Sequence, residues 1–98
     1  MGVLLLRLYV AGHTPRSEHA IANLRRICEE ALPGQYELVI IDVLECPQLA
    51  EAEKILATPT LIRLSPPPLR RVVGDLSSTE KVLLGLELPP SAGAGQEG

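Results

Sequence analysis

Two cysteines are the residues of this chain that could supply the most distinctive chemistry. A thiol oxidoreductase needs a cysteine of lowered pKa at a helix N-terminus, usually within a Cys-x-x-Cys motif. Cys28 lies in an apolar stripe, where cysteine serves as a small buried hydrophobe. Cys46 precedes Pro47 near a predicted helix start, so a reactive role for Cys46 stays an alternative. Neither cysteine has a second thiol nearby in sequence, and we expect neither to be a redox nucleophile.

The other residue types used in catalysis are not arranged in a recognisable site. His13 and His19 have no cysteine or carboxylate at metal-ligand spacing. Gly12 follows the first apolar run without the repeated glycines and the lysine of a phosphate-binding loop. Asp42 and Asp75 are expected to cap turns rather than to transfer protons. The sequence therefore predicts a protein that is not an enzyme, with no catalytic residues, no metal and no cofactor.

Composition narrows the partners that this chain can have. The 98 residues carry a net charge of -3 with a pI of about 5.3, which disfavours nucleic acid. Tyr9 and Tyr36 are the only aromatic residues, so the stacking platforms of single-strand binders are missing. No segment reaches the roughly 20 apolar residues of a membrane span, and the short apolar start is predicted to be a strand rather than a signal peptide. The cytoplasm is the expected compartment.

The first half of the chain predicts a βαβ unit. Val3–Val10 is an almost continuous apolar run, typical of a strand with both faces covered. Thr14 and Pro15 have the pattern of an N-cap followed by proline at the first helical position, and Pro33–Gly34 ends that helix. Tyr36–Leu44 is rich in β-branched residues and is predicted to be a central strand.

The second half predicts shorter elements. A helix over Pro47–Leu56 is expected to turn Leu49, Ala52, Ile55 and Leu56 inward. Strands are expected over Thr60–Leu64 and, at an edge, over Arg70–Val73, on either side of three prolines that fit neither a helix nor a central strand. A last helix follows Ser77 and Glu80, which have the spacing of a capping box.

Thr58-Pro59 lies at the predicted corner between the short helix and the third strand. A residue before proline is displaced toward extended geometry, and X-Pro bonds are the common place for a cis peptide. The order β-α-β-α-β-β-α is that of the thioredoxin fold, in which a cis-proline occupies this corner. We therefore expect one α/β domain over residues 1–88 and a disordered tail over residues 89–98, which is rich in small residues.

Six motifs follow one another along the chain. They are Leu8-Tyr9-Val10-Ala11-Gly12-x-Thr14-Pro15-x-Ser17, Ile41-Asp42-Val43-Leu44-x-x-Pro47-Gln48-Leu49-Ala50-Glu51, Lys54-Ile55-Leu56-Ala57-Thr58-Pro59-Thr60-Leu61, Pro66-Pro67-Pro68-x-Arg70-Arg71, Gly74-Asp75-Leu76-Ser77, and Glu80-Lys81-Val82-Leu83-x-Gly85-Leu86. In this order the motifs resemble the KaiB family of circadian clock proteins. The resemblance covers nearly the whole predicted domain, from Leu4 to Leu88.

The resemblance implies a non-enzymatic regulator of the hexameric ATPase KaiC, in a circadian clock or an hourglass timer. Proteins of this family rest as homo-oligomers, tetramers or dimers, with a βαββααβ arrangement, and switch as monomers to the thioredoxin-like βαβαββα fold. The switched form docks on KaiC, where it captures KaiA or competes with a sensor histidine kinase whose N-terminal domain is KaiB-like.

The resemblance also implies roles for particular residues. Lys54, Arg70 and Arg71 match basic docking positions that would meet an acidic patch on KaiC. Gly85 and Glu87 match positions linked to fold switching, and replacing them with Ala and Arg is expected to favour the thioredoxin-like monomer. Because X-Pro bonds exchange slowly, we add Thr58, Pro59, Pro66, Pro67 and Pro68 as candidate fold-switch residues.

The chain departs from the family pattern at a few positions. His19 replaces a basic residue, Val39 stands where lysine is common, and the acidic tail of the family is replaced by a short Gly-Ala-Pro tail. These differences suggest a divergent member and leave open the dominant fold, the resting oligomer and the existence of a KaiA partner. The alternative functions are a thioredoxin-like redox or small-molecule-binding protein and a stress-response adaptor.

Overall fold

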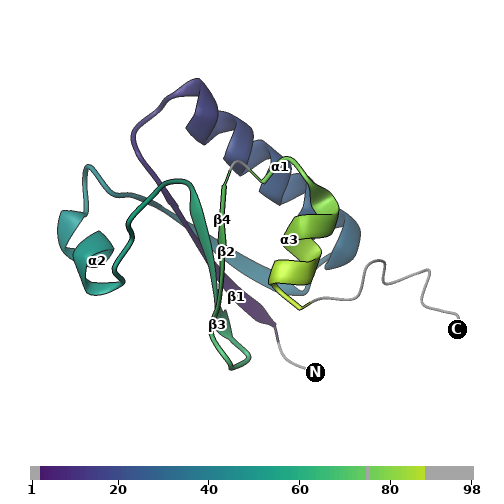
Figure 1. Ribbon diagram of the computed structural model, residues 1–98. Coiled ribbons are helices and arrows are strands. Elements are labelled where there is room, and N and C mark those ends of the chain that lie inside the picture. Colours follow the sequence, from purple (N-terminus) through teal and green to yellow (C-terminus); the bar gives the residue numbers. More distant parts are fainter. Residues whose placement is uncertain (1–2, 75, 88–98) are drawn as a thin grey trace, which may run out of the picture.

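The computed structural model describes residues 3–74 and 76–87 of the chain. Its elements are β1 (Leu4–Val10), α1 (Pro15–Ala31), β2 (Tyr36–Asp42), α2 (Pro47–Ala52), β3 (Thr60–Ser65), β4 (Arg70–Val73) and α3 (Thr79–Gly85) (Figure 1). This is the predicted βαβαββα order. The expected tail over residues 89–98 lies outside the described residues.

The strands form a four-stranded mixed sheet in the order β2-β1-β3-β4. β1 pairs in parallel with β2 and antiparallel with β3, which pairs antiparallel with β4. The prediction that the Tyr36 strand is central is wrong, because β2 lies at one edge and β1 takes the central place. Among the β-branched residues of β2, Val39 is exposed, Ile40 is half-buried and Ile41 is buried. α1 covers one face of the strand, and the other face is covered only near Ile41. β4 is the other edge, as predicted.

The main core lies between the sheet and the layer formed by α1 and α3 (Figure 1). Its buried residues are Leu6, Leu8 and Val10 of β1, Ala20, Leu24, Ile27 and Cys28 of α1, Leu61 of β3, Leu76, and Val82, Leu83 and Leu86 at α3. Full burial of one such large apolar side chain contributes about 1.5–3 kcal/mol. This layer therefore holds α1 and α3 in place on the sheet.

The opposite face of the sheet carries a smaller apolar cluster of Tyr9, Ile41 and Ile62. The predicted helix over Pro47–Leu56 is too long, because α2 ends at Ala52 and Lys54 has a φ of 56° that no right-handed helix accommodates. Ile55 then packs against the small cluster. The expectation that Leu49, Ala52 and Leu56 face inward is wrong: α2 buries none of its residues, and Leu56 is 96% exposed.

The helix starts follow local capping chemistry. The Thr14 hydroxyl accepts a hydrogen bond from Ser17 N at 3.1 Å, as the sequence predicts for the start of α1. The cap of α3 is Ser78 rather than Ser77, and its hydroxyl accepts from Lys81 N at 3.3 Å. Between residues 3 and 87, with residue 75 set aside, the structure contains no helix of the length and apolarity that crossing a membrane requires.

Candidate functional site

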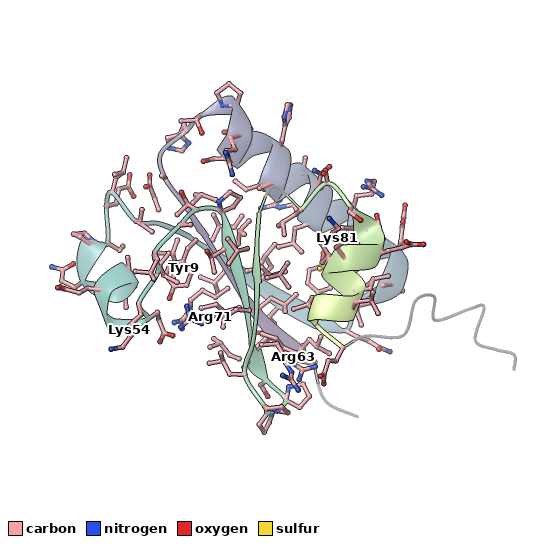
Figure 2. All side chains as sticks on the ribbon, viewed as in Figure 1. Tyr9, Lys54, Arg63, Arg71 and Lys81 are labelled. Atoms are coloured by element: carbon pink, nitrogen blue, oxygen red, sulfur yellow. The ribbon has the colours of Figure 1, made fainter. Side chains whose placement is uncertain are left out.

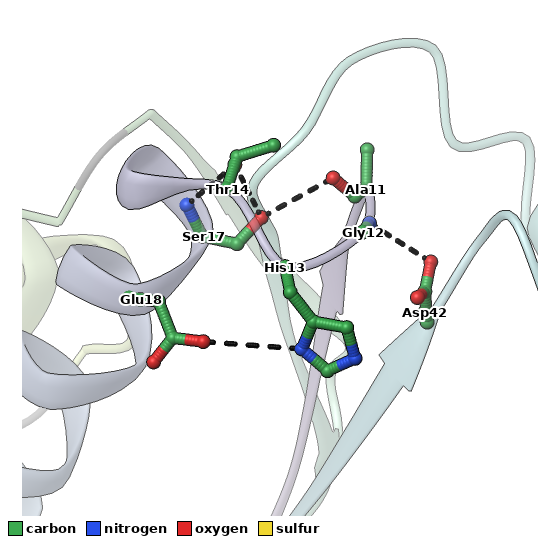
Figure 3. Close-up of polar contacts among 7 residues, drawn as sticks. All are labelled: Ala11, Gly12, His13, Thr14, Ser17, Glu18 and Asp42. Carbon is green, nitrogen blue, oxygen red and sulfur yellow. Dashed lines mark hydrogen bonds and ion pairs between the residues drawn. The ribbon is translucent and has the colours of Figure 1, made fainter.

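The loop from β1 into α1 occupies the place where a thioredoxin-type enzyme carries its reactive cysteine. In this chain the Ser17 hydroxyl donates to the Ala11 carbonyl at 3.4 Å, and His13 Nδ1 lies 3.9 Å from the Glu18 carboxylate (Figure 3). Thr14 caps the helix. These polar groups satisfy the start of α1, and no thiol is present between Gly12 and Ser17.

Asp42 stabilises this loop from the end of β2. Its carboxylate accepts a hydrogen bond from Gly12 N at 3.0 Å (Figure 3) and another from Leu44 N at 2.9 Å. These backbone bonds favour the charged form and lower the pKa of Asp42. The geometry agrees with the predicted turn-capping role for Asp42, whereas Asp75 lies outside the described residues.

The predicted cis bond is present at Thr58-Pro59. Pro59 is fully buried, its carbonyl accepts a hydrogen bond from Gly74 N at 3.1 Å, and the Thr60 hydroxyl donates to Ala57 O at 2.6 Å. Thr60 is the register partner of Tyr9 near the end of β1. The corner therefore lies at the same end of the sheet as the loop into α1, as in the thioredoxin fold.

The two cysteines lie on opposite faces of the sheet. Cys28 belongs to the main core, and burial is the largest cause of a rise in the pKa of its thiol from 9.0 to about 11. Cys46 packs against the small cluster of the other face. This arrangement gives no pair of adjacent thiols for disulfide chemistry and offers no support to the redox alternative.

The histidines are also separate. His13 lies beside Glu18, while His19 lines an open cavity of about 640 Å³ together with Arg16, Asn23 and Ser77. Across residues 3–74 and 76–87, no group of three or more His, Cys, Asp or Glu side chains is arranged to hold a metal ion.

The three predicted docking residues do not share one surface. Arg71 lies on the α2 side, where its guanidinium donates to the Glu53 carbonyl and lies 3.9 Å from the Glu53 carboxylate. Lys54 follows Glu53, so Lys54 and Arg71 are brought together (Figure 2). Arg70 points to the other face and pairs with Glu87, with Nη2 and Oε2 at 2.6 Å. The structure thus joins a predicted docking residue, Arg70, to a predicted fold-switch residue, Glu87.

The other predicted fold-switch residues lie in the β3–β4 turn and at the end of α3. Cis bonds occur at Ser65-Pro66 and Pro67-Pro68, and the prolines of this turn are exposed. Gly85 is the last residue of α3 and lies against Val72 of β4.

Sequence reasoning missed Arg63, a buried cation in β3. Its exposed fraction is 6%, and its Nη1 donates to the Leu86 carbonyl at 2.6 Å while Nη2 donates to the Pro68 carbonyl at 2.9 Å. The signal that could have found it is a single arginine within the apolar run Thr60–Leu64. An arginine buried in a sheet strand needs acceptors from a neighbouring element.

The comparisons with known proteins agree with this architecture. A family model described as "KaiB domain" matches residues 7–88. The circadian clock protein KaiB3 of Synechocystis sp. is 60% identical over 90 residues, covering 92% of this chain and 88% of that protein. The circadian clock oscillator protein KaiB of one Prochlorococcus marinus strain is 60% identical over 84 residues, covering 86% and 78%. Both relatives are named as circadian clock proteins.

Solved structures give the same result for the fold. The N-terminal domain of Synechococcus elongatus SasA is similar with a TM-score of 0.72 and 29% identity, covering 100% of this chain and 90% of that domain. Mitochondrial thioredoxin 3 of Saccharomyces cerevisiae has a TM-score of 0.70 at 17% identity, covering 89% and 79%, and at that identity it shows the fold alone. The fold is thioredoxin-like, and the chain belongs to the KaiB family of circadian clock proteins.

Proposed function

We propose that this protein regulates a KaiC-type hexameric ATPase by docking on it in the thioredoxin-like form. Membership of a clock-protein family supports a regulatory role in a clock or an hourglass timer, and the KaiC partner is inferred from the motifs that the chain shares with that family. The domain has the thioredoxin-like arrangement that this docking requires.

The contact between Arg71 and Glu53 is the observation that carries the proposal. It places a basic side chain of β4 beside the end of α2, where Lys54 and the fully exposed Leu56 follow. We call Lys54, Leu56 and Arg71 the α2 surface, and Figure 2 labels Lys54 and Arg71. The exposed Leu56 side chain and the cations of Lys54 and Arg71, the latter paired with Glu53, suit a partner surface that is acidic and also buries apolar area. The charges would mainly guide association.

Arg70 has a different role in this proposal. Its guanidinium is engaged by Glu87 on the α3 side of the sheet, so a partner on the α2 surface does not reach it without a rearrangement of α3. We therefore assign Lys54 and Arg71 to docking and Arg70 to the stability of the thioredoxin-like form.

The proposal includes the fold switch and the resting homo-oligomer of the family, with residues 53–87 as the part that rearranges. It also includes competition with a sensor kinase, or capture of KaiA, on the same ATPase. The similarity of this chain to the SasA N-terminal domain supports competition, because two domains of one shape can occupy one docking position.

The test is size-exclusion chromatography of the full chain with the KaiC homologue of its own organism, in ATP and in ADP, over hours. The expected result is slow appearance of a complex that Arg71→Glu abolishes. Arg26→Glu is the matched control, because Arg26 is an exposed arginine of α1 outside the α2 surface. No complex in either nucleotide after a day would overturn the proposed partner.

A second comparison separates docking from folding. Arg70→Gln removes the ion pair with Glu87 and leaves the α2 surface unchanged. We expect this variant to bind more weakly only to the extent that its thioredoxin-like form is less populated. Loss of binding with a fully retained thioredoxin-like fold would instead place Arg70 in the interface.

A further inference from the structure

The last three residues of the α3 region each contact the β3–β4 hairpin. Gly85 packs against Val72, the Leu86 carbonyl accepts from Arg63, and the Glu87 carboxylate pairs with Arg70. Figure 2 shows Arg63 on the α3 side of the sheet. Two of the three arginines of the hairpin, Arg63 and Arg70, therefore reach the same end of α3.

Arg63 and Arg70 are direct register partners across β3 and β4. Like charges placed directly opposite each other destabilise a strand pair. Burial adds a second cost, because a buried guanidinium is unfavourable unless its donors find acceptors. Among the described residues, no carboxylate lies within ion-pair distance of Arg63, and its Nε has no hydrogen-bond partner.

The end of α3 supplies most of the compensation for these two cations. Arg63 receives one carbonyl from Leu86 and another from the Pro68 turn, and Arg70 receives the only carboxylate at this position among the described residues. If α3 leaves the sheet, Arg70 loses its counter-ion and Arg63 keeps a single acceptor. The two guanidinium groups then face each other across the hairpin, which weakens the hairpin itself.

We propose that Arg63 and Arg70 form a two-arginine clamp that makes the β3–β4 hairpin and α3 open and close as one cooperative unit. The clamp connects a strand pair to a helix through charges rather than through apolar contacts alone. In the fold switch, the clamp determines how readily residues 60–87 leave the thioredoxin-like arrangement. This last consequence rests on the proposed function, whereas the clamp itself is a property of the thioredoxin-like monomer.

The test is native-state hydrogen exchange of the thioredoxin-like monomer of the full chain, isolated by size-exclusion chromatography and without KaiC, followed by mass spectrometry as urea is raised. In the wild type, amides of residues 60–73 and 79–87 are expected to exchange in one shared opening. Glu87 lies outside the hairpin, yet Glu87→Gln should accelerate amide exchange within the hairpin by about fivefold. This factor corresponds to the loss of an ion pair worth about 1 kcal/mol. Glu80→Gln is the control, because Glu80 is the exposed glutamate at the other end of α3.

A second variant, Arg63→Met, tests the coupling between the hairpin and α3 whether the hairpin becomes more stable or less stable. Arg63→Met removes the buried charge and its donors but retains an apolar stem, so the hairpin can gain or lose stability. The expected signature is separation of the shared opening into two, with α3 opening at lower urea than the hairpin. Arg26→Met should leave one shared opening.

Three results would overturn the clamp. In the first, the hairpin and α3 of the wild type exchange independently. In the second, the effect of Glu87→Gln on exchange is confined to α3 or is equalled by that of Glu80→Gln. In the third, Arg63→Met keeps one shared opening. The experiment contains no KaiC, so a confirmed clamp without a KaiC complex would refute the proposed partner alone. A KaiC complex with independent openings would refute the clamp alone.

Discussion

Gly85 packs so closely against β4 that a Cβ atom at this position would lie 2.5 Å from Val72 Cγ2. Its φ is not in the left-handed region, so glycine is needed here for the close approach and not for its backbone conformation. The backbone of the helix end therefore lies directly against the Val72 side chain of the edge strand.

Gly85→Ala should therefore destabilise the thioredoxin-like form. Overpacking of this kind costs about 1–3 kcal/mol, which lowers the Tm of a domain of this size by roughly 4 °C or more. Thermal unfolding followed by circular dichroism measures the change. Val72→Ala in the Gly85→Ala background should recover part of the loss, and a Gly85→Ala variant as stable as the wild type would show that Val72 moves aside at no cost.

The double variant Gly85→Ala with Glu87→Arg tests the fold-switch assignment. In the observed arrangement both changes are unfavourable, since alanine meets Val72 and an arginine at position 87 would face Arg70. The variant can favour the thioredoxin-like monomer, as the family resemblance implies, only by destabilising the resting arrangement more. Size-exclusion chromatography should then show a shift to monomer, and an unchanged oligomeric size would remove these two residues from the switch.

Leu56→Ser should separate binding from stability. Leu56 is 96% exposed, so the free energy of unfolding should change by less than about 0.5 kcal/mol. If the α2 surface docks on KaiC, the affinity should fall roughly tenfold, or about 1.4 kcal/mol. Leu84→Ser is the control, because Leu84 is 74% exposed on α3, and equal effects of the two variants on binding would argue against the α2 surface.

Asp42→Asn should alter the acid sensitivity of the fold. The folded-state pKa of Asp42 is lowered by hydrogen bonds from Gly12 and Leu44, so its contribution to stability is present above the ordinary aspartate pKa of about 4 and is lost as the pH falls through the lowered value. We expect a lower Tm for Asp42→Asn at pH 7 and a difference from the wild type that shrinks below about pH 4. Glu45→Gln, an exposed neighbour, should show no such trend.

Alkylation with iodoacetamide should distinguish the two cysteines. Cys28 is 1% exposed with a pKa raised to about 11, and only its thiolate reacts. At pH 8 its labelling in the native protein should be on the order of a hundredfold slower than in urea, as the thiolate fractions imply. Peptide mass spectrometry locates the label, and rapid labelling of Cys28 in the native protein would contradict its place in the core.

The raised pKa of Cys28 also predicts a loss of stability at alkaline pH. The folded chain holds the thiol proton more tightly than the unfolded chain, so stability decreases as the pH rises from about 9 through 11. Cys28→Ala should reduce this alkaline decrease, and urea unfolding at a series of pH values measures it.

The element order was predictable because local signals agree along most of the chain. Thr14 and Pro15 define the start of α1, and the apolar runs of β1 and β3 are unambiguous. The place of β2 in the sheet was not predictable in the same way, since β-branched residues suit a half-buried edge strand as well as a central one. The end of α2 was missed because Lys54 has a left-handed backbone conformation, which a lysine in the sequence does not predict.

The candidate site was predictable only in part. The family resemblance assigns both Arg70 and Arg71 to docking, yet successive residues of a strand point to opposite faces. Applied to the predicted strand over Arg70–Val73, this rule would have separated them. The partner of Arg70, Glu87, and the carbonyl partners of Arg63 depend on how α3 packs on the sheet, which no local pattern specifies.

The strand order has a consequence for how the molecule divides. Residues 4–42 form a complete parallel unit in which β1, α1 and β2 contact one another, and in the sheet this unit is joined to the rest of the described chain by the single ladder between β1 and β3. The β1–β3 ladder is therefore the boundary in the sheet between the first half of the chain and the second half. A rearrangement of the second half would break this one ladder of the sheet and the packing of α3 in the main core. The parallel ladder between β1 and β2 would not have to open.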